Sequence, residues 1–295
     1  MQGEKGIVCV TGGTGYIGSW LIFRLLDHGY SVRTTVRFNP ENEKDISFLT
    51  SLPGASEKLK IFNADLSNPE SFAAAIEGCV GVFHVATPVD FENKEAEEIV
   101  TKISIDGALG ILNACLDSKT VKKVVYTSSS SAVIFNGKDV DEMDESFWSD
   151  MDYAKSLKSN AGSYIISKTL TERAVLEFSE KHGLEVVTLI PSFVVGPFIC
   201  PKLPSSVLSV FDMVLGEKTE SSSCLDLVHV DDVARAHIFL FEHHESKGSS
   251  RFKLNGSKLP CLSSKKLLDS GFEFKYGVED MFDDAIKCCK EKGYL

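Results

Sequence analysis

Two side chains in the middle of the chain are spaced for proton transfer. Tyr164 and Lys168 lie four residues apart in a segment whose apolar residues Leu170, Ala174 and Phe178 have helical spacing. Residues four apart stand on the same side of a helix. A lysine ammonium beside a phenol stabilises the phenolate. We therefore expect Lys168 to lower the pKa of Tyr164 from about 10 toward the range of an acid catalyst.

A run of hydroxyl side chains precedes this pair. It extends from Thr127 to Ser131 and follows an apolar strand pattern at 123–127. Ligands of open α/β sheets lie at the carboxyl ends of the strands, where this run is expected. Ser129 could orient a substrate carbonyl there and stabilise charge developing on its oxygen. A Tyr-x-x-x-Lys spacing occurs by chance in many helices, so its weight comes from this serine run and from a glycine loop earlier in the chain.

The glycine loop lies near the N-terminus in the stretch IVCVTGGTGYIGSWLIFRLLD, residues 7–27. The pattern predicts a buried strand at 7–10, a turn at 11–15 and an amphipathic helix that begins after the turn. Strand and helix flank the glycines in the order that a dinucleotide-binding fold requires. A loop that merely turns the chain is the alternative, which this context disfavours.

The glycines at 12, 15 and 18 form a G-x-x-G-x-x-G variant of the dinucleotide fingerprint, with an extra glycine at 13. Gly12 would allow the tight turn, Gly15 would let backbone N–H groups reach a pyrophosphate, and Gly18 would let the helix pack closely. The helix N-terminus would then present its positive dipole end to the anion.

Strand and helix patterns alternate after this unit, which predicts right-handed βαβ units and a parallel sheet. Further strands are expected at 31–37, 58–63, 80–85, 123–127 and 185–190. Helices are expected at 68–78, near 99–114 and from Tyr164 onward. The packing face of the second of these helices would carry Ile99, Ile103, Gly107, Gly110 and Ala114. We predict an α/β chain with a Rossmann-type doubly wound parallel sheet that Pro191 ends. Residues 1–190 would form the dinucleotide-binding domain and 191–295 a smaller C-terminal substrate lobe, with about 225–243 returning to the first domain.

A basic residue follows the second predicted strand, where the adenosine ribose lies in such folds. Arg37 stands about 20 residues after the glycine loop, and Lys44 could add a second positive charge. A basic residue there accommodates the 2′-phosphate of NADP, whereas an acidic one favours NAD. We therefore expect NADPH/NADP+ as the cofactor. Asp65, after the third strand, could contact the adenine amino group or simply form a turn.

Composition excludes several classes of function. The net charge of −11 argues against nucleic acid as a partner. No apolar run is expected to reach membrane-spanning length, and the N-terminal residues MQGEKG lead straight into the first strand with no signal peptide, so a cytoplasmic protein is expected. The eight cysteines show no metal-binding spacing, which indicates reduced thiols. The segment His229 to Asp232 predicts a strand end and an aspartate-capped helix rather than a metal site, and no metal is expected.

Several longer stretches resemble one family. VCVTGGTGYIGSWL, FNADLSNPESFAAAIEGCVGVFHVATPVDF, VVYTSSSSA, DESFWSD, SKTLTERAVLEF, VVGPF and LVHVDDVARAHIFLFE are similar to the plant dihydroflavonol reductase group of extended short-chain dehydrogenase/reductases. That group includes vestitone reductase, cinnamoyl-CoA reductase and cinnamyl-alcohol dehydrogenase relatives. The likeness covers nearly the whole chain.

The resemblance implies an NADPH-dependent reductase of a phenylpropanoid or flavonoid aldehyde or ketone. Ser129, Tyr164 and Lys168 would be the catalytic triad, with Tyr164 donating the proton and Lys168 also holding the nicotinamide ribose. The partner would be a small aromatic substrate, and the chain a monomer or weak homodimer. The cofactor contacts implied are Gly12, Gly15, Tyr16, Ile17, Gly18, Arg37, Lys44, Asp65, Leu66, Ala86, Thr87, Thr127, Tyr164, Lys168, Pro191 and Val194.

Two departures from the family narrow the substrate. Cinnamoyl-CoA reductases carry N-W-Y-C-Y-G-K around the tyrosine, whereas this chain has AGSYIISK at 161–168, which disfavours a CoA thioester. Dihydroflavonol reductases place a polar residue where this chain has Ile134, so a less polar pocket is expected. Segments 218–225 and 246–262 also look shorter than in the family, which indicates a shortened lobe or residues missing from the sequence.

The alternatives are a cinnamoyl-CoA reductase, an NAD-dependent sugar-nucleotide epimerase or dehydratase of the same superfamily, and a non-catalytic nucleotide-sensing protein. Arg37 disfavours the epimerase, because those enzymes generally keep NAD. The intact triad disfavours the sensor. Fold alone does not decide between them.

Overall fold

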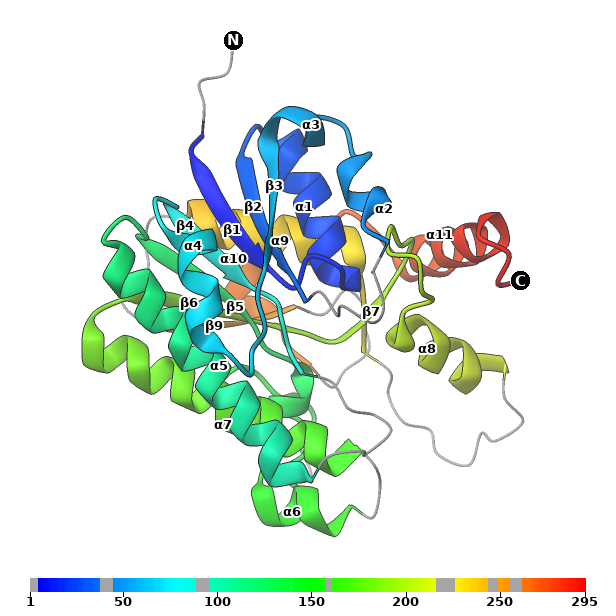
Figure 1. Ribbon diagram of the computed structural model, residues 1–295. Helices are drawn as coiled ribbons and strands as arrows, with labels where there is room; N and C mark the ends of the chain where they lie inside the picture. The colour runs from blue at the N-terminus through cyan, green and yellow to red at the C-terminus, as the bar shows by residue number, and fades with distance from the viewer. Residues whose placement is uncertain are drawn as a thin grey trace.

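A seven-stranded parallel sheet forms the centre of the computed structural model, which describes residues 5–37, 45–88, 96–138, 140–157, 161–215, 226–243, 249–254 and 262–295 (Figure 1). The strand order is β3-β2-β1-β4-β5-β6-β9, and every neighbouring pair is parallel. The strands are β1 (Ile7–Thr11), β2 (Ser31–Val36), β3 (Leu59–Asn63), β4 (Gly81–His84), β5 (Lys123–Thr127), β6 (Glu185–Pro191) and β9 (Ser250–Leu254). The Rossmann-type α/β prediction is confirmed.

The order of the strands reverses at β1 and β4. The chain runs outward from β1 through β2 to β3 and then returns to place β4 on the other side of β1. The crevice outside such a reversal, at the carboxyl ends of the strands, is where doubly wound sheets bind ligands. The loops after β1, β4 and β5 therefore meet at one edge.

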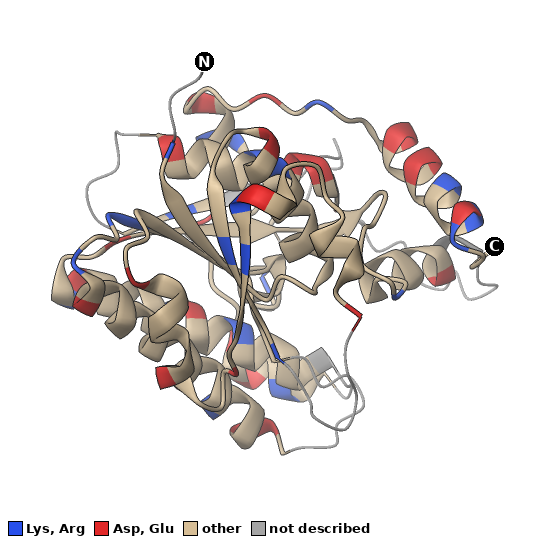
Figure 2. Cartoon of the chain, turned by 45° about the horizontal axis from the view of Figure 1, so that its top comes forward, with Lys and Arg blue, Asp and Glu red and all other residues tan. Residues whose placement is uncertain are grey.

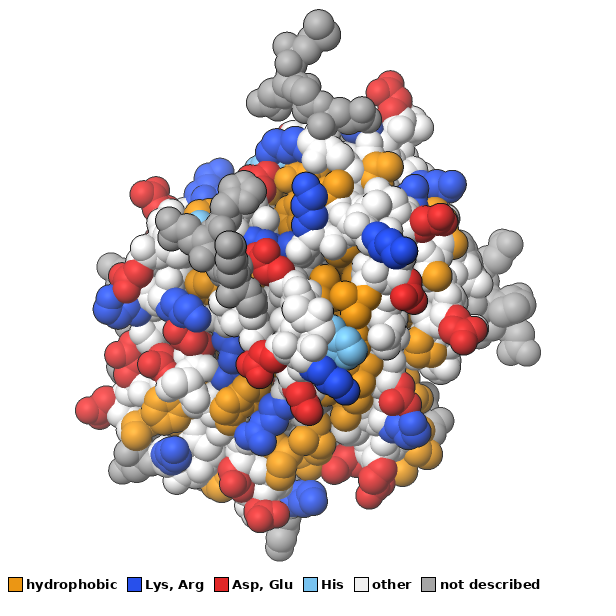
Figure 3. Space-filling view, turned by 90° about the vertical axis from the view of Figure 1, so that its left-hand side faces the viewer, with side chains coloured by type: hydrophobic (Ala, Val, Ile, Leu, Met, Phe, Trp, Pro, Cys, Tyr) orange, Lys and Arg blue, Asp and Glu red, His pale blue; other side chains and the backbone are white. Residues whose placement is uncertain are grey.

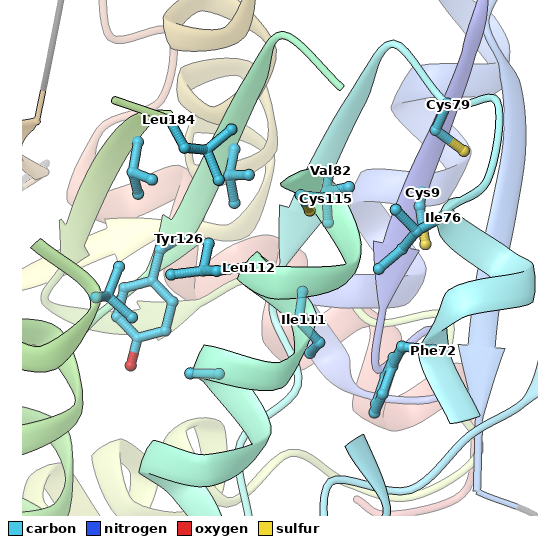
Figure 4. Close-up of a cluster of buried hydrophobic side chains, with 14 of the residues drawn as sticks. Cys9, Phe72, Ile76, Cys79, Val82, Ile111, Leu112, Cys115, Tyr126 and Leu184 are labelled. Atoms are coloured by element: carbon cyan, nitrogen blue, oxygen red, sulfur yellow. The ribbon is translucent and has the colours of Figure 1, made fainter. Parts of the chain in front are cut away.

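Helices cover both faces of the sheet. One face packs against α1 (Tyr16–Asp27) and α9 (Val230–Glu242), and the short helices α2 (Ser47–Thr50) and α3 (Ala55–Lys58) join this layer. The other face packs against α4 (Ala73–Ile76), α5 (Glu97–Ser118) and α7 (Ala161–His182). Figure 4 shows the core under this second layer, where Cys9, Cys79 and Cys115 lie among Ile76, Val82 and Leu112.

The buried thiols behave as small apolar side chains. Cys9, Cys79, Cys115, Cys200, Cys288 and Cys289 are free and buried, whereas Cys224 and Cys261 lie outside the described residues. Burial raises the pKa of the Cys79 thiol to about 11, which keeps it protonated and unreactive. The expectation of reduced thiols holds for these six.

Helix α5 corrects two expectations. Within the described residues it is the one helix long and apolar enough to cross a membrane, a length that the sequence reading did not assign to any run. It is a core helix, because it packs along α7 and buries Ile111 and Leu112. The sequence also predicted the wrong packing face for this helix. Ile99, expected on that face, is 48% exposed. Gly107 contacts Leu66 and Gly110 contacts Pro69, so these glycines pack on the segment after β3 and not on the sheet.

The helix expected at 68–78 is split into a 3-10 turn η1 (Pro69–Phe72) and α4 (Ala73–Ile76). Asn68 stands at the N-cap position, but its side chain makes no capping hydrogen bond. A second 3-10 turn, η2 (Ser130–Ala132), follows β5, and α6 (Met151–Ser156) precedes α7. Asp150 caps α6 by accepting from the backbone N–H of Tyr153.

The sequence predicted that the sheet ends at Pro191, and this prediction is wrong. Pro191 is the last residue of β6, in register with Leu254 of β9, so a strand from the C-terminal third forms the sheet edge. Of the segments expected to be compressed, 218–225 and most of 246–262 lie outside the described residues, and 250–254 is β9.

Most of the remaining C-terminal elements form a smaller unit beside the sheet. It contains a two-stranded parallel sheet of β7 (Phe193–Val195) and β8 (Leu227–His229), with α8 (Ser205–Leu215) and α11 (Val278–Glu291). Helix α10 (Lys265–Asp269) packs instead on β9, at the edge of the main sheet. Figure 2 marks several acidic residues along α11, and Figure 3 shows charges of both signs interspersed with apolar side chains on one face of the molecule. That face carries no extended basic patch of the kind that nucleic acid requires.

Candidate active site

The ammonium of Lys168 lies at the carboxyl edge of the sheet. Lys168 lies on the second turn of α7. Its Nζ donates to the carbonyl oxygen of Thr127 at 2.9 Å and to Thr87 Oγ1 at 3.2 Å. It also stands over the ring of Tyr126, 5.4 Å from the centroid. The side chain is almost fully buried, and burial lowers the pKa of Lys168 to about 8. The lysine is thus held at the ends of β4 and β5 in a partly desolvated position.

Tyr164 lies one turn before Lys168 on α7 and contacts Ser129, which follows β5. They share a hydrogen bond that favours the phenolate and opposes the larger effect of burial, which raises the pKa of Tyr164 above its ordinary value. Ser129 stands at the N-cap position of η2, where its Oγ accepts from the backbone N–H of Ser131 at 3.2 Å. The structure therefore brings together all three residues that the sequence chose.

The expected direction of the Tyr164 pKa was wrong. The sequence argument had Lys168 lowering it, but the ammonium of Lys168 is directed at Thr127 and Thr87. Burial dominates and raises the pKa, and Ser129 is the group that counteracts it. Tyr164 is consequently protonated at neutral pH, the form in which a phenol can donate a proton.

The glycine loop is shaped by contacts that leave no room for side chains. Gly12 has φ +75°, and a Cβ there would lie 2.9 Å from Ala86 Cα. A Cβ on Gly18 would lie 2.3 Å from the carbonyl oxygen of Gly12, so the helix start packs on the turn itself. The extra glycine is also required, because a Cβ on Gly13 would lie 2.1 Å from Thr34 Oγ1.

The N-terminus of α1 is suited to an anion. Gly15 is the N-cap residue, no side chain caps the helix, and its first turn contains no acidic residue. Gly15 is exposed, and a Cβ there would meet only the Gly12 carbonyl oxygen at 3.3 Å. These residues fit the pyrophosphate of a dinucleotide, which would accept hydrogen bonds from backbone N–H groups at this open helix end.

Arg37 and Asp65 are neighbours beyond the ends of β2 and β3. Arg37 Nε lies 3.9 Å from Asp65 Oδ2, and both side chains are at least one-third exposed. Asp65 Oδ1 accepts from the backbone N–H and the hydroxyl of Ser67, so the turn-forming role left open by the sequence is present. Lys44 lies outside the described residues.

Other residues expected at the cofactor have different surroundings. Tyr16 donates from its hydroxyl to the carbonyl oxygen of Gly196 at 3.0 Å, joining the glycine loop to the smaller unit, and Ile17 packs in the cluster around Val233. Leu66 packs against Gly107 of α5. Pro191 and Val194 are both buried.

Two buried histidines that the sequence analysis did not select support this edge. Thr11 Oγ1 accepts from the backbone N–H groups of Val85 and Ala86 and donates to His84 Nδ1 at 2.9 Å. Thr127 Oγ1 donates to Nε2 of His237 at 2.7 Å, because Nδ1 of that ring donates to the Val233 carbonyl oxygen. Burial lowers the pKa of His84 to about 3 and of His237 to about 4, so both rings are neutral.

The segment that could suggest a metal site is structural. His229, rather than an aspartate, caps α9 by accepting from the backbone N–H of Asp231, which corrects the expected aspartate cap. Asp231 binds Arg24 and Trp20, and Asp232 accepts from Arg235 and from the backbone N–H groups of 275 and 276. No group of three possible metal ligands occurs in the described part of the chain.

Glu172 is the charged residue of this region that the sequence analysis missed. It is fully buried and accepts a hydrogen bond from Ser128, which directly precedes Ser129. A signal was present, because Glu172 follows Lys168 by four residues and so lies on the same helix face.

Comparison with known proteins decides the family. Residues 8–254 match the model of the NAD dependent epimerase/dehydratase family. Vestitone reductase of Medicago sativa is 56% identical over 326 aligned residues that cover all of both chains, and its crystal structure matches with a TM-score of 0.87 at 54% identity, covering 99% of this chain and 100% of the other. The chain belongs to the dihydroflavonol reductase-like extended short-chain dehydrogenase/reductases.

A second relative agrees with this assignment, and a further solved structure shares the fold. A dihydroflavonol 4-reductase of Callistephus chinensis is 44% identical, over 98% of this chain and 87% of its own. Yeast methylglyoxal/isovaleraldehyde reductase Gre2, complexed with NADPH, shares the fold at a TM-score of 0.82 and 22% identity, over 98% of this chain and 100% of that one. The chain is therefore an oxidoreductase of an NAD(P)-binding family. The alignment with vestitone reductase has more positions than this chain has residues, so the relative carries segments without a counterpart here.

Proposed function

We propose that this protein is an NADPH-dependent reductase of an isoflavonoid or flavonoid ketone. The observation that carries the proposal is the meeting of Ser129, Tyr164 and Lys168 at the carboxyl edge of the sheet, next to a glycine loop suited to a dinucleotide. Full-length similarity to a vestitone reductase and to a dihydroflavonol 4-reductase supports the class of substrate.

NADPH would supply the hydride, and the protein would handle the oxygen of the carbonyl. Ser129 would donate a hydrogen bond to that oxygen, and Tyr164 would transfer its phenolic proton to it as negative charge develops. Ser129, which already hydrogen-bonds Tyr164, would stabilise the resulting phenolate, and Lys168, one turn along α7, would hold the nicotinamide ribose hydroxyls. Arg37 would hold the 2′-phosphate, and the N-terminus of α1 the pyrophosphate.

Ile134 favours a less polar substrate than a polyhydroxylated dihydroflavonol. It follows η2 five residues after Ser129 and is partly buried. A branched apolar side chain cannot hydrogen-bond a substrate hydroxyl, so a ring with fewer hydroxyl groups near that position would bind better.

The test is NADPH oxidation with three carbonyl classes: an isoflavanone ketone, a dihydroflavonol ketone and an aromatic aldehyde. We expect turnover of the isoflavanone with a higher kcat/KM than of the other two. Turnover of the aldehyde alone would refute the ketone as the substrate class and assign an aldehyde instead. No turnover with any of the three would refute the reductase proposal. NADH in place of NADPH, with the best substrate, tests the cofactor part independently.

A further inference from the structure

We propose that Glu172 is a positioning residue of this site: paired with Arg251, it holds helix α7 to the strand end that carries Ser129 and favours the charged form of Lys168. The inference rests on the proposed reductase function, which gives those two residues their roles. Glu172 itself is fully buried and its carboxylate is bonded to other side chains, so the role proposed for it acts through Ser129 and Lys168.

One carboxylate joins three elements of the sheet to α7. Oε2 of Glu172 accepts from Ser128 Oγ at 2.7 Å, and Oε1 accepts from Thr188 Oγ1 of β6 at 2.8 Å and from Arg251 Nε of β9 at 2.9 Å. The carboxyl group is completely buried. Because Ser128 precedes Ser129 and Glu172 follows Lys168 by one helical turn, the distance between the serine and the lysine is set through this group.

Arg251 extends the same network to the segment 145–150. Its Nη1 donates to the carbonyl oxygens of Glu145 and of Phe147, the latter at 3.1 Å, and its guanidinium lies 3.6 Å from the ring centroid of Trp148. Ser149, in this segment, donates from Oγ to the carbonyl oxygen of Ser131 at 2.7 Å and from its backbone N–H to that of Ala132 at 2.9 Å. The turn after Ser129 is therefore fixed from a second side.

The charge of Glu172 has a further effect on Lys168. The lysine is buried, which disfavours its ammonium form, and Glu172 is the anionic group that opposes this. The other titratable groups that face Lys168 carry no compensating charge at neutral pH: His84 of β4 is neutral, and burial raises the pKa values of Tyr126 of β5 and Tyr164 of α7. Arg251 is paired with the Glu172 carboxylate, at 2.9 Å between Nε and Oε1.

Stability alone does not explain such a pair. A buried ion pair is often no more stabilising than apolar residues of the same volume, because desolvation of both charges offsets their attraction. Here the pair links α7 to Ser128 after β5, to β6 and to β9. This position indicates that the pair fixes the place of Ser129 relative to Lys168 and supplies a negative charge near Lys168.

The experiment compares Glu172→Gln with wild type. Glutamine keeps the size, and its one carbonyl oxygen can accept from Ser128 or from Thr188 while its NH2 group donates to the hydroxyl oxygen of the other. It removes the charge and leaves Arg251 cationic, and both changes lower the pKa of Lys168. We expect a decrease of about one unit or more in that pKa, measured by NMR of labelled lysine and assigned with Lys168→Met. The alkaline limb of the kcat profile should move by the same amount.

Glu177→Gln is the matched control, because it makes the same change at an exposed position of the same helix. It should move neither the Lys168 pKa nor the alkaline limb. A folded Glu172→Gln protein in which the Lys168 pKa is unchanged would overturn the proposal.

Two charge-preserving variants cover the case in which Glu172→Gln does not fold. Ser128→Ala and Thr188→Val each remove one hydrogen bond to Glu172, and each should lower kcat about 3- to 10-fold with the alkaline limb and KM for NADPH unmoved. Wild-type kcat in both would refute the positioning role. Absence of turnover in the wild-type protein would count against the reductase function only, because the lysine titration requires no substrate.

Discussion

The ammonium of Lys168 donates a hydrogen bond of 2.9 Å to the carbonyl oxygen of Thr127, the last residue of β5. This contact places the charged end of a helix side chain at the carboxyl edge of the sheet, two residues before Ser129. In the proposed reaction, this contact would let residues of two separate segments act on one carbonyl group.

Replacement of Tyr164 by phenylalanine should remove the proton donor. We expect Tyr164→Phe to lower kcat about 10²- to 10⁴-fold, the usual contribution of a general acid, while NADPH binding changes little. Steady-state NADPH oxidation and fluorescence titration of NADPH measure the two effects. Tyr30→Phe, a tyrosine before β2 that donates to Glu242, is the control. Wild-type turnover in Tyr164→Phe would exclude Tyr164 as the acid.

Replacement of Arg37 by aspartate should change the preferred cofactor. The substitution removes the charge expected at the 2′-phosphate and adds a carboxylate that can bind a 2′-hydroxyl, next to Asp65. A hydrogen bond to a charged group is worth about 1.5–3 kcal/mol, so the NADPH/NADH ratio of kcat/KM should fall about 10- to 100-fold. Lys60→Asp makes the same charge change at an exposed position of the neighbouring strand β3, opposite Arg33, and should leave the ratio unaltered. An unchanged ratio in Arg37→Asp would disprove the assigned role.

Two alanine substitutions in the glycine loop should have different effects. Gly13→Ala places a Cβ 2.1 Å from Thr34 Oγ1, and such overpacking costs about 1–3 kcal/mol of unfolding free energy. Gly15→Ala meets only one oxygen at 3.3 Å and has an extended backbone, so stability should be nearly unchanged. Its methyl group would stand where the pyrophosphate approaches, and NADPH should bind about tenfold more weakly or worse. Urea unfolding and NADPH titration of both variants check this, and equal stability of the two would contradict it.

Acid should destabilise the protein through His237. Its pKa is lowered by burial to about 4, whereas the unfolded chain has an ordinary imidazole near pKa 6.5. As pH falls from 6.5 toward 4 the unfolded state binds a proton that the folded state refuses, so stability is lost over that window. Between pH 7 and pH 4.5 the loss from this one group is about 2 kcal/mol.

The variant His237→Gln removes this titration. Urea unfolding at pH 7 and at pH 4.5 measures how much unfolding free energy each protein loses between the two pH values. The loss should be smaller in His237→Gln than in wild type, by about 2 kcal/mol. His182→Gln, at an exposed histidine near the end of α7, should follow wild type. Parallel pH dependence of His237→Gln and wild type would show that another group controls acid unfolding.

The sequence by itself determined the parallel α/β architecture, the glycine loop and the three residues of the proposed triad. These depend on local signals: strand and helix periods, positions where only glycine fits, and a four-residue helical spacing. Alternation of strand and helix then leaves few topologies, because crossovers are right-handed. The same reasoning could not see β9, because Ser250–Leu254 is a short strand whose partner β6 lies about 60 residues earlier in the chain.

Only the tertiary structure decided the surroundings of the triad. The Tyr164 pKa is raised rather than lowered, because burial depends on all the elements packed around the phenol and on where the Lys168 ammonium points. The link from Glu172 to Ser128 and Arg251 joins positions 44 and 79 residues away from Glu172, and no periodic pattern contains such a contact. Side-chain spacing along one helix is local, whereas burial and long-range hydrogen bonds exist only once the sheet has brought distant segments together.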